Sequence, residues 1–150
     1  MEWERYEIAS RPNGLEYEFY SDGPKGRVKK VIKLQREPGL GQNVYNLMFG
    51  DYNENANLVD DGAVSNNSDR RAVLRTVAEV VDVFINLNPK AIIHIRGRSA
   101  SRIRLYQMGI ASAWLEISER YDILGECNNR WIPFKKGVNY EAFIVFKKIA

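Results

Sequence analysis

The stretch SDRRAVLRTVAEVVDVFINLNPKAIIHIR, residues 68–96, predicts a helix followed by a buried strand. Apolar side chains recur every three or four residues, as an amphipathic helix over residues 69–87 requires, at Val73, Val77, Val80, Val81 and Phe84. Ser68 or Asn67 is expected to cap this helix, and the pair Asn88 and Pro89 to end it. Isoleucines then fall on both faces of residues 90–96, which indicates a central strand covered on both sides.

Three strands are predicted before this helix. Polar and apolar residues alternate over residues 15–20 and 28–35, and residues 43–50 follow as a third strand, so an antiparallel meander is expected. Residues 51–67 are rich in Asn and Asp and are interpreted as a loop.

A second helix is predicted after Gly97, with an apolar stripe at Ile103, Tyr106, Ile110, Trp114 and Ile117. A short strand near residues 122–126, an irregular segment over 128–137 and a last strand over 139–148 complete the chain. The first helix bridges the third and fourth strands, which makes those two strands parallel. The predicted fold is therefore α+β, with a mixed, mostly antiparallel sheet and two main helices.

The composition favours one cytoplasmic domain over residues 1–150. The 150 residues are 45% hydrophobic, which allows a chain of this length to bury a core unaided. The only cysteine, Cys127, cannot form an internal disulfide. The amino terminus opens with charged residues, and no apolar run approaches the roughly 18 residues that span a membrane. A net charge of +3 permits weak attraction to phosphate-bearing partners.

Arginines gather where the two helices are expected to begin. Arg70 and Arg71 open the first helix, and a second group is Arg96, Arg98, Arg102 and Arg104. Cations are unfavourable at a helix amino terminus, which already carries about half a positive charge, and a bound phosphate or carboxylate would relieve the conflict. The alternative is that the arginines are solvated or pair with acidic residues such as Asp51, Asp60, Asp61 and Asp69.

The sequence gives less support to a catalytic histidine, a metal site or a nucleic-acid surface. His94, the only histidine, lies mid-strand, where a hydrogen-bonded structural role is expected. One His and one Cys cannot make a zinc site, and no metal is predicted. Aromatic residues near the amino terminus (Trp3, Tyr6, Tyr17, Phe19 and Tyr20) accompany basic ones (Lys25, Arg27, Lys29, Lys30 and Lys33). A nucleic-acid surface is one interpretation, but the sequence has no RNP-like run or recognition-helix pattern, and core packing with a solvated strand face is the preferred account.

The segments SNNSDRRAVLRTVAEVVDVF (65–84) and PKAIIHIRGRSASRIRLYQMGI (89–110) resemble a family of small uncharacterised bacterial proteins of about 150 residues. The likeness also takes in the strand from Tyr45 to Asp51 and the ending NYEAFIVFKK, and so covers most of the chain. It implies the domain boundaries and no reaction.

The order of predicted elements is also similar to the acetyl-CoA-dependent N-acetyltransferase superfamily. That resemblance implies that the loop before the first helix holds a cofactor pyrophosphate, and that a Leu-Tyr pair on the second helix lies near the thioester. By position, the pair matches Leu105 and Tyr106, and the loop residues are Asn66, Asn67, Ser68, Asp69 and Arg70. The chain has NNSDRR where the superfamily has a glycine-rich loop.

Two functions are therefore carried forward. The first is a domain that binds a phosphate-bearing small ligand, with coenzyme A or a nucleotide as candidates, at Asn66, Asn67, Ser68, Asp69, Arg70, Arg71, Arg98, Arg102 and Arg104. Tyr106 would protonate the leaving thiolate if the domain were an acyltransferase. The second is a non-catalytic module that binds a protein or nucleic acid. Catalysis and oligomeric state stay open.

Overall fold

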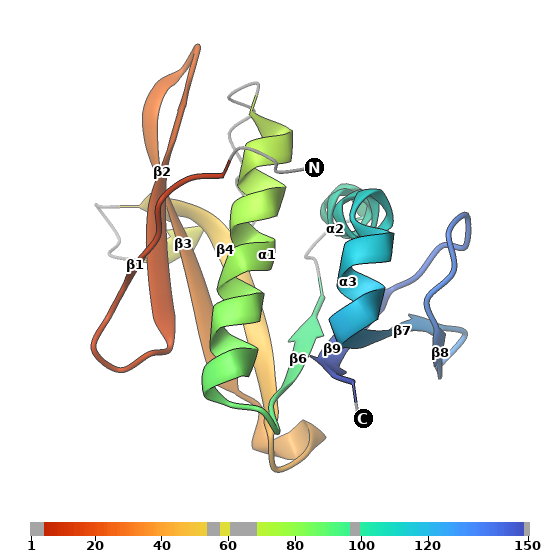
Figure 1. The fold of residues 1–150 in the computed structure, drawn as a ribbon. Coiled ribbons are helices and arrows are strands. Elements are labelled where there is room, and N and C mark those ends of the chain that lie inside the picture. The colour runs from red at the N-terminus through yellow and green to blue at the C-terminus, as the bar shows by residue number, and fades with distance from the viewer. Residues whose placement is uncertain (1–4, 54–57, 61–68, 97–99, 149–150) are drawn as a thin grey trace. The chain divides into compact units, whose positions relative to one another are not determined.

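The computed structural model describes residues 5–53, 58–60, 69–96 and 100–148. They form an α+β fold with nine strands and three α-helices among the described residues (Figure 1). The chain divides into two compact units, the first made of Met1–Gln35 with Met48–Phe84 and the second of Arg36–Leu47 with Ile85–Ala150. Because each unit combines two separate segments, neither is a continuous piece of chain. One domain over residues 1–150 stays a prediction.

The first unit packs a helix on one face of a sheet. Its strands are β1 (Ala9–Ser10), β2 (Glu16–Gly23), β3 (Gly26–Arg36), the second half of β4 (Val44–Asn53) and β5 (Leu58–Asp60). Helix α1 (Arg70–Leu87) lies along β2, β3 and β4 (Figure 1). Alternate residues of β2, such as Tyr17 and Phe19, are buried, as are Val73, Val80 and Phe84 of α1. The predicted period-two strand and amphipathic helix are both confirmed.

The start of α1 corrects one prediction. The amide of Val73 donates to the carbonyl of Asp69 at 3.0 Å, the first i to i−4 bond of the helix. Asp69 therefore occupies the cap position that was expected of Ser68 or Asn67, both of which lie outside the described residues.

The second unit contains the parallel strand pair. It holds the first half of β4, a 3-10 helix (η1, Pro38–Leu40), β6 (Ile92–Ile95), β7 (Tyr121–Cys127), β8 (Arg130–Pro133) and β9 (Ala142–Lys147). Val44 of β4 pairs with Ile92 of β6 in parallel, and β9 pairs antiparallel with β6 and β7. The hydrogen-bonded strand order is β1-β2-β3-β4-β6-β9-β7-β8, with β5 on β4. The predicted crossover and the central position of β6 are confirmed.

Two segments that were expected to be irregular contain strands. Within the predicted loop 51–67, β4 continues to Asn53 and β5 pairs with it antiparallel. Within residues 128–137, β8 forms a hairpin with β7 through Asn128 and Asn129, whose φ angles are 52° and 63°. Two central residues with positive φ define the type I′ turn that suits a two-residue hairpin, and asparagine tolerates that conformation.

The second predicted helix is two helices, α2 (Ala100–Ser112) and α3 (Trp114–Arg120). The hydroxyl of Ser112 donates to the carbonyl of Gly109 at 2.9 Å, which satisfies a carbonyl at the end of α2 without another helical turn. Ala113 then leaves the helical conformation, with φ −112° and ψ 19°. The break sets the Trp114 ring 5.1 Å from that of Phe134. None of the described helices is long and apolar enough to cross a membrane.

An aromatic cluster fills the second unit around a glycine. The rings of Phe134, Tyr140 and Phe143 lie 5.5 to 6.0 Å apart. Gly125 of β7 faces this cluster, and a Cβ at that position would overlap the ring of Tyr140. The glycine is thus required by packing, because it is not among the glycines with positive φ.

We predict that Gly125→Ala lowers the free energy of unfolding by about 1–3 kcal/mol, the usual cost of overpacking a core. Gly39→Ala is the control, because a Cβ there has no atom within 4 Å. Urea unfolding of the two variants measures the difference. Equal stability of Gly125→Ala and the unchanged protein would contradict the packing assignment.

Candidate functional site

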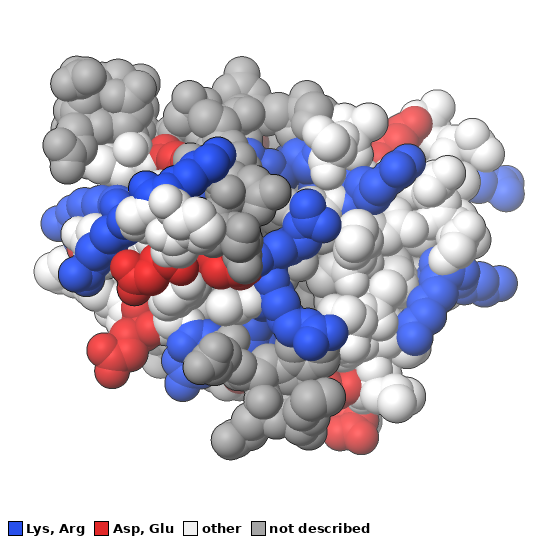
Figure 2. Space-filling view, turned by 90° about the horizontal axis from the view of Figure 1, so that it is seen from above, with Lys and Arg blue, Asp and Glu red and all other residues white. Residues whose placement is uncertain are grey.

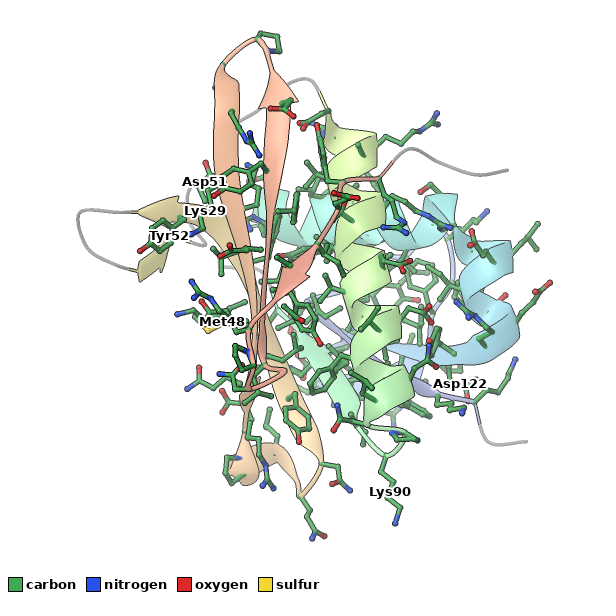
Figure 3. All side chains as sticks on the ribbon, turned by 60° about the vertical axis from the view of Figure 1, so that its left-hand side comes forward. Lys29, Met48, Asp51, Tyr52, Lys90 and Asp122 are labelled. Carbon is green, nitrogen blue, oxygen red and sulfur yellow. The ribbon has the colours of Figure 1, made fainter. Side chains whose placement is uncertain are left out.

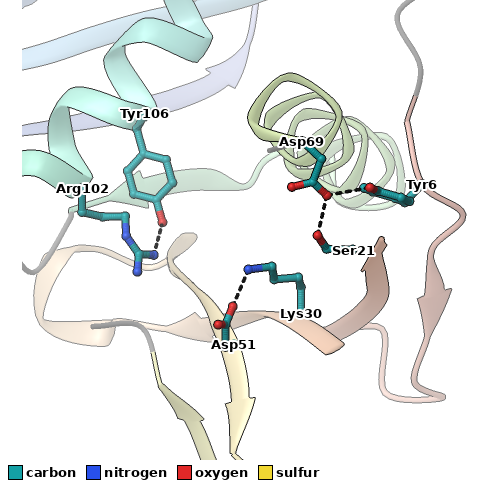
Figure 4. Close-up of polar contacts among 7 residues, drawn as sticks. All are labelled: Tyr6, Ser21, Lys30, Asp51, Asp69, Arg102 and Tyr106. Atoms are coloured by element: carbon teal, nitrogen blue, oxygen red, sulfur yellow. Dashed lines mark hydrogen bonds and ion pairs between the residues drawn. The ribbon is translucent and has the colours of Figure 1, made fainter. Parts of the chain in front are cut away.

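Three polar side chains meet where α1 begins in the first unit. The hydroxyl of Tyr6 donates to Asp69 Oδ2 at 2.6 Å, and the buried hydroxyl of Ser21 donates to the same oxygen (Figure 4). We call Tyr6, Ser21 and Asp69 the hydroxyl–carboxylate cluster. Burial, and then the hydrogen bond to Asp69, raise the pKa of the Tyr6 phenol above its ordinary value of 10.0. The Tyr6 hydroxyl is therefore a neutral hydrogen-bond donor that joins the amino-terminal segment to the start of α1.

A buried ion pair lies on the same sheet. Lys30 of β3 contacts Asp51 of β4 through Nζ and Oδ1, and the lysine side chain is fully buried while the aspartate is 15% exposed (Figure 4). Lys30 is buried on the apolar face of β3, so it is not part of a basic surface that could contact nucleic acid. The only signal in the sequence was a lysine at an inward position of an alternating strand, and nothing identified its partner.

The predicted phosphate-binding residues of the first unit fall into two groups. Arg70 and Arg71 are exposed in the first turn of α1, which contains no acidic residue. Asn66, Asn67 and Ser68 lie outside the described residues. Asp69 directs its carboxylate to the hydroxyls of Tyr6 and Ser21. The structure thus gives Asp69 an internal role that the sequence did not reveal, because Tyr6 and Ser21 are distant along the chain.

The arginines of the second unit have different surroundings from one another. Arg96 forms an ion pair with Glu126, an acidic residue that was not among its expected partners. Arg102 is only 7% exposed, and Arg104 is exposed. Arg98 lies outside the described residues. These four arginines therefore do not make one solvent-exposed cluster in the part of the chain that is described.

Tyr106, the predicted proton donor, is buried in α2. Its hydroxyl accepts a hydrogen bond of 3.5 Å from Nη1 of Arg102, one turn earlier in the helix (Figure 4). The two side chains share the buried face of α2 with Ile110. Packing explains this position of the ring, and the guanidinium supplies a polar neighbour for its hydroxyl.

His94 is held between two strands and a tryptophan. Its Nδ1 lies 3.3 Å from Oδ1 of Asn46, its cross-strand neighbour on β4, and its ring meets that of Trp131 edge-on at 6.0 Å. Burial lowers the pKa of His94 below 6.5, and the charge of Arg96 lowers it further. The predicted hydrogen-bonded, structural environment agrees with this geometry.

The solvent face of β2 and β3 combines cations with acids and aromatic rings. The guanidinium of Arg27 lies 4.2 Å from the centre of the Tyr20 ring. Nζ of Lys29 lies 4.4 Å from the centre of the Tyr52 ring, and both residues are labelled in Figure 3. Lys29 also pairs with Glu18 at 3.3 Å. On the face shown in Figure 2, basic side chains occur in separate groups with acidic and uncharged ones between them. Tyr17 and Phe19, which were considered for base stacking, are buried.

The fold and these polar clusters define an α+β protein with a mixed, mostly antiparallel sheet, and comparison with known proteins gives its family. Residues 2–148 match the model of a family of unknown function (DUF6934), and the chain belongs to that family. The expected relationship to a family without an assigned activity is thereby confirmed. No curated protein and no solved structure matches the chain.

We predict that Lys30→Met costs about 3–5 kcal/mol of stability, because it leaves the Asp51 carboxylate without its buried cation. The double variant Lys30→Met/Asp51→Leu should cost less than the sum of the single changes. Lys29→Met, one residue away on the opposite face of β3, is the control and should cost at most about 1 kcal/mol. Urea unfolding provides all four values, and additive single changes would refute the coupling.

A second prediction concerns His94. Its imidazole should titrate below pH 6.5 in an NMR experiment, where one histidine gives one unambiguous signal. Because the unfolded chain then binds the proton first, the contribution of His94 to stability is complete above pH 6.5 and declines as the pH falls below it.

Arg96→Gln should raise the pKa of His94 without bringing it to 6.5, since burial is the larger cause. Lys90→Gln, at the other end of the segment, is the control for the loss of one charge. A His94 pKa above 6.5 in the unchanged protein would show that the imidazole is not buried as described.

Proposed function

We propose that the protein binds a small phosphate-bearing ligand at the start of α1, in a fold with acetyltransferase-like topology. The observation that carries the proposal is the crossover from β4 through α1 to the parallel strand β6. In such a crossover the helix begins beyond the carboxyl end of the first strand. Ligands of open α/β sheets bind at that end of the strands, and phosphates bind at helix amino termini.

The order of elements supports the comparison with N-acetyltransferases. Strands β2, β3 and β4 precede α1, β6 follows it, and α2 and α3 lead to the two longer carboxyl-terminal strands β7 and β9. The resemblance concerns topology, because NNSDRR replaces a glycine-rich loop at residues 66–71. We therefore expect side chains, rather than closely approaching backbone amides, to make most of the contacts with the ligand.

Electrostatics at α1 favour an anion. The positive end of the helix dipole and the guanidinium groups of Arg70 and Arg71 repel one another, and a phosphate would be attracted to both. The carboxylate of Asp69, next to them in the sequence, accepts hydrogen bonds from Tyr6 and Ser21. The proposal assigns direct ligand contact to Arg70 and Arg71, together with Asn66, Asn67 and Ser68.

The proposal has two further parts. It also includes the sequence hypothesis that Arg98, Arg102 and Arg104 bind an anion, and that Tyr106 is the proton donor if the ligand is an acyl thioester. Replacing Tyr106 by Phe would then reduce acyl transfer while ligand binding is kept. A cytoplasmic location, where coenzyme A and nucleotides are available, belongs to the same proposal.

The proposal is tested by thermal unfolding with coenzyme A, acetyl-coenzyme A and a panel of nucleotides. A ligand at 100 times its dissociation constant adds about 2.7 kcal/mol, which raises the melting temperature of a chain of this size by roughly 5–10 °C. Arg70→Ala should weaken binding about tenfold, the order expected for a lost hydrogen bond to a charged group. Lys90→Ala, just beyond the other end of α1, is the control.

A melting temperature unchanged by every phosphate-bearing compound would refute the proposal. In that case the interaction module would become the favoured function, and salt-sensitive binding to DNA or RNA would be measured next.

A further inference from the structure

A pocket lies within the second unit, between α2 and the segment that leads into β9. From α2 it is lined at every third or fourth residue by Ala100, Ile103, Arg104, Gln107, Met108 and Ala111. This stripe is distinct from the face that buries Arg102, Tyr106 and Ile110. The opposite wall is formed by Gly137, Asn139, Tyr140 and Glu141, and the cavity volume is about 700 Å³. Sites for small molecules commonly measure roughly 300–1,000 Å³.

Hydrogen bonds and ring packing within the protein fix the wall of the pocket opposite α2. Gln107 donates from its amide to the carbonyl of Val138, and the amide of Lys135 donates to the Tyr140 hydroxyl at 2.8 Å. The ring of Tyr140 is fixed against Phe143 and above Gly125, where a side chain would collide with it. The pocket is therefore formed before a ligand binds, and binding would cost little conformational entropy of the protein.

The pocket combines apolar surface with two opposite charges. Ile103, Met108 and the Tyr140 ring provide the apolar part. Arg104 and Glu141 are both exposed, and neither side chain has an ion pair within the described part of the chain. A guanidinium binds a carboxylate through two parallel hydrogen bonds, and a carboxylate accepts hydrogen bonds from an ammonium group.

We propose that this pocket binds a small zwitterion with an apolar side chain, of the amino-acid type. Arg104 binds its carboxylate, Glu141 binds its ammonium group, and Ile103 and Met108 contact its side chain. This goes beyond the phosphate site at α1, and it assigns to Arg104 a carboxylate in place of the phosphate considered above. A free amino acid and a short peptide share this chemistry, so both are included in the test.

The experiment is NMR or calorimetric titration of the intact protein with leucine, methionine and the dipeptide leucyl-leucine. N-acetyl-leucine lacks the ammonium group and leucinamide lacks the carboxylate. We expect saturable binding of at least one zwitterion, and about tenfold weaker binding of each capped compound, as for loss of a hydrogen bond to a charged group. Preference for the dipeptide over leucine would identify a peptide as the ligand, and the reverse a free amino acid.

Two variants test which protein side chain binds each charged group of the ligand. Arg104→Gln should weaken zwitterion binding about tenfold and remove the difference between leucine and leucinamide, and Glu141→Gln should do the same for leucine and N-acetyl-leucine. The controls are Lys136→Gln, in the same segment but outside the lining, and Glu119→Gln on α3. All four positions are exposed, so the fold should be kept, which circular dichroism checks.

The two proposals can fail separately. Glu141→Gln should leave coenzyme A binding unchanged, and Arg70→Ala should leave zwitterion binding unchanged. The pocket proposal is overturned if no compound binds saturably at up to about 10 mM, a concentration beyond the usual range for small-ligand sites. It is equally overturned if the capped compounds bind as well as the zwitterions, or if neither variant changes their affinity.

Discussion

The parallel pairing of β4 with β6 is the constraint on which the rest of the structure depends. Two parallel strands cannot be joined by a tight turn, so the chain must return along a crossover, here α1. The same strand β4 pairs antiparallel with β5 at its other end, so one strand contributes to both units. The position of Arg70 and Arg71 after β4 therefore follows from the topology of the crossover, independently of any ligand chemistry.

Polar groups on the inner face of the first unit require explanation, because burying them costs free energy unless each has a partner. Lys30 has Asp51, and Ser21 and Tyr6 have Asp69. A pairing shifted by one residue would bring Lys30 to the solvent side and leave Asp51 without it. The buried ion pair consequently favours a single register of β3 and β4, at some cost in stability compared with an apolar pair.

The sequence predicts the elements whose signals are local and periodic. Helix α1 and strand β6 follow from the spacing of valines and isoleucines, and both are as expected. Strand β8 was missed because its signal is the turn at Asn128 and Asn129 rather than a hydrophobic pattern. The break at Ala113 was missed because the apolar stripe continues across it. Contacts between residues far apart in the sequence, such as Tyr6 with Asp69, produce no periodic pattern, so one sequence does not predict them. Arg104 was noticed because it belongs to a run of arginines, whereas no pattern singled out Glu141, which lines the same pocket.

The missing side chain at Gly125 has a consequence for other members of the family. Two positions that share one small volume cannot vary independently. A relative with a larger residue at the position of Gly125 should therefore carry a smaller one at the position of Tyr140, and with it a differently shaped pocket. The two positions would then sort relatives by the size of molecule they accommodate, before any activity is known.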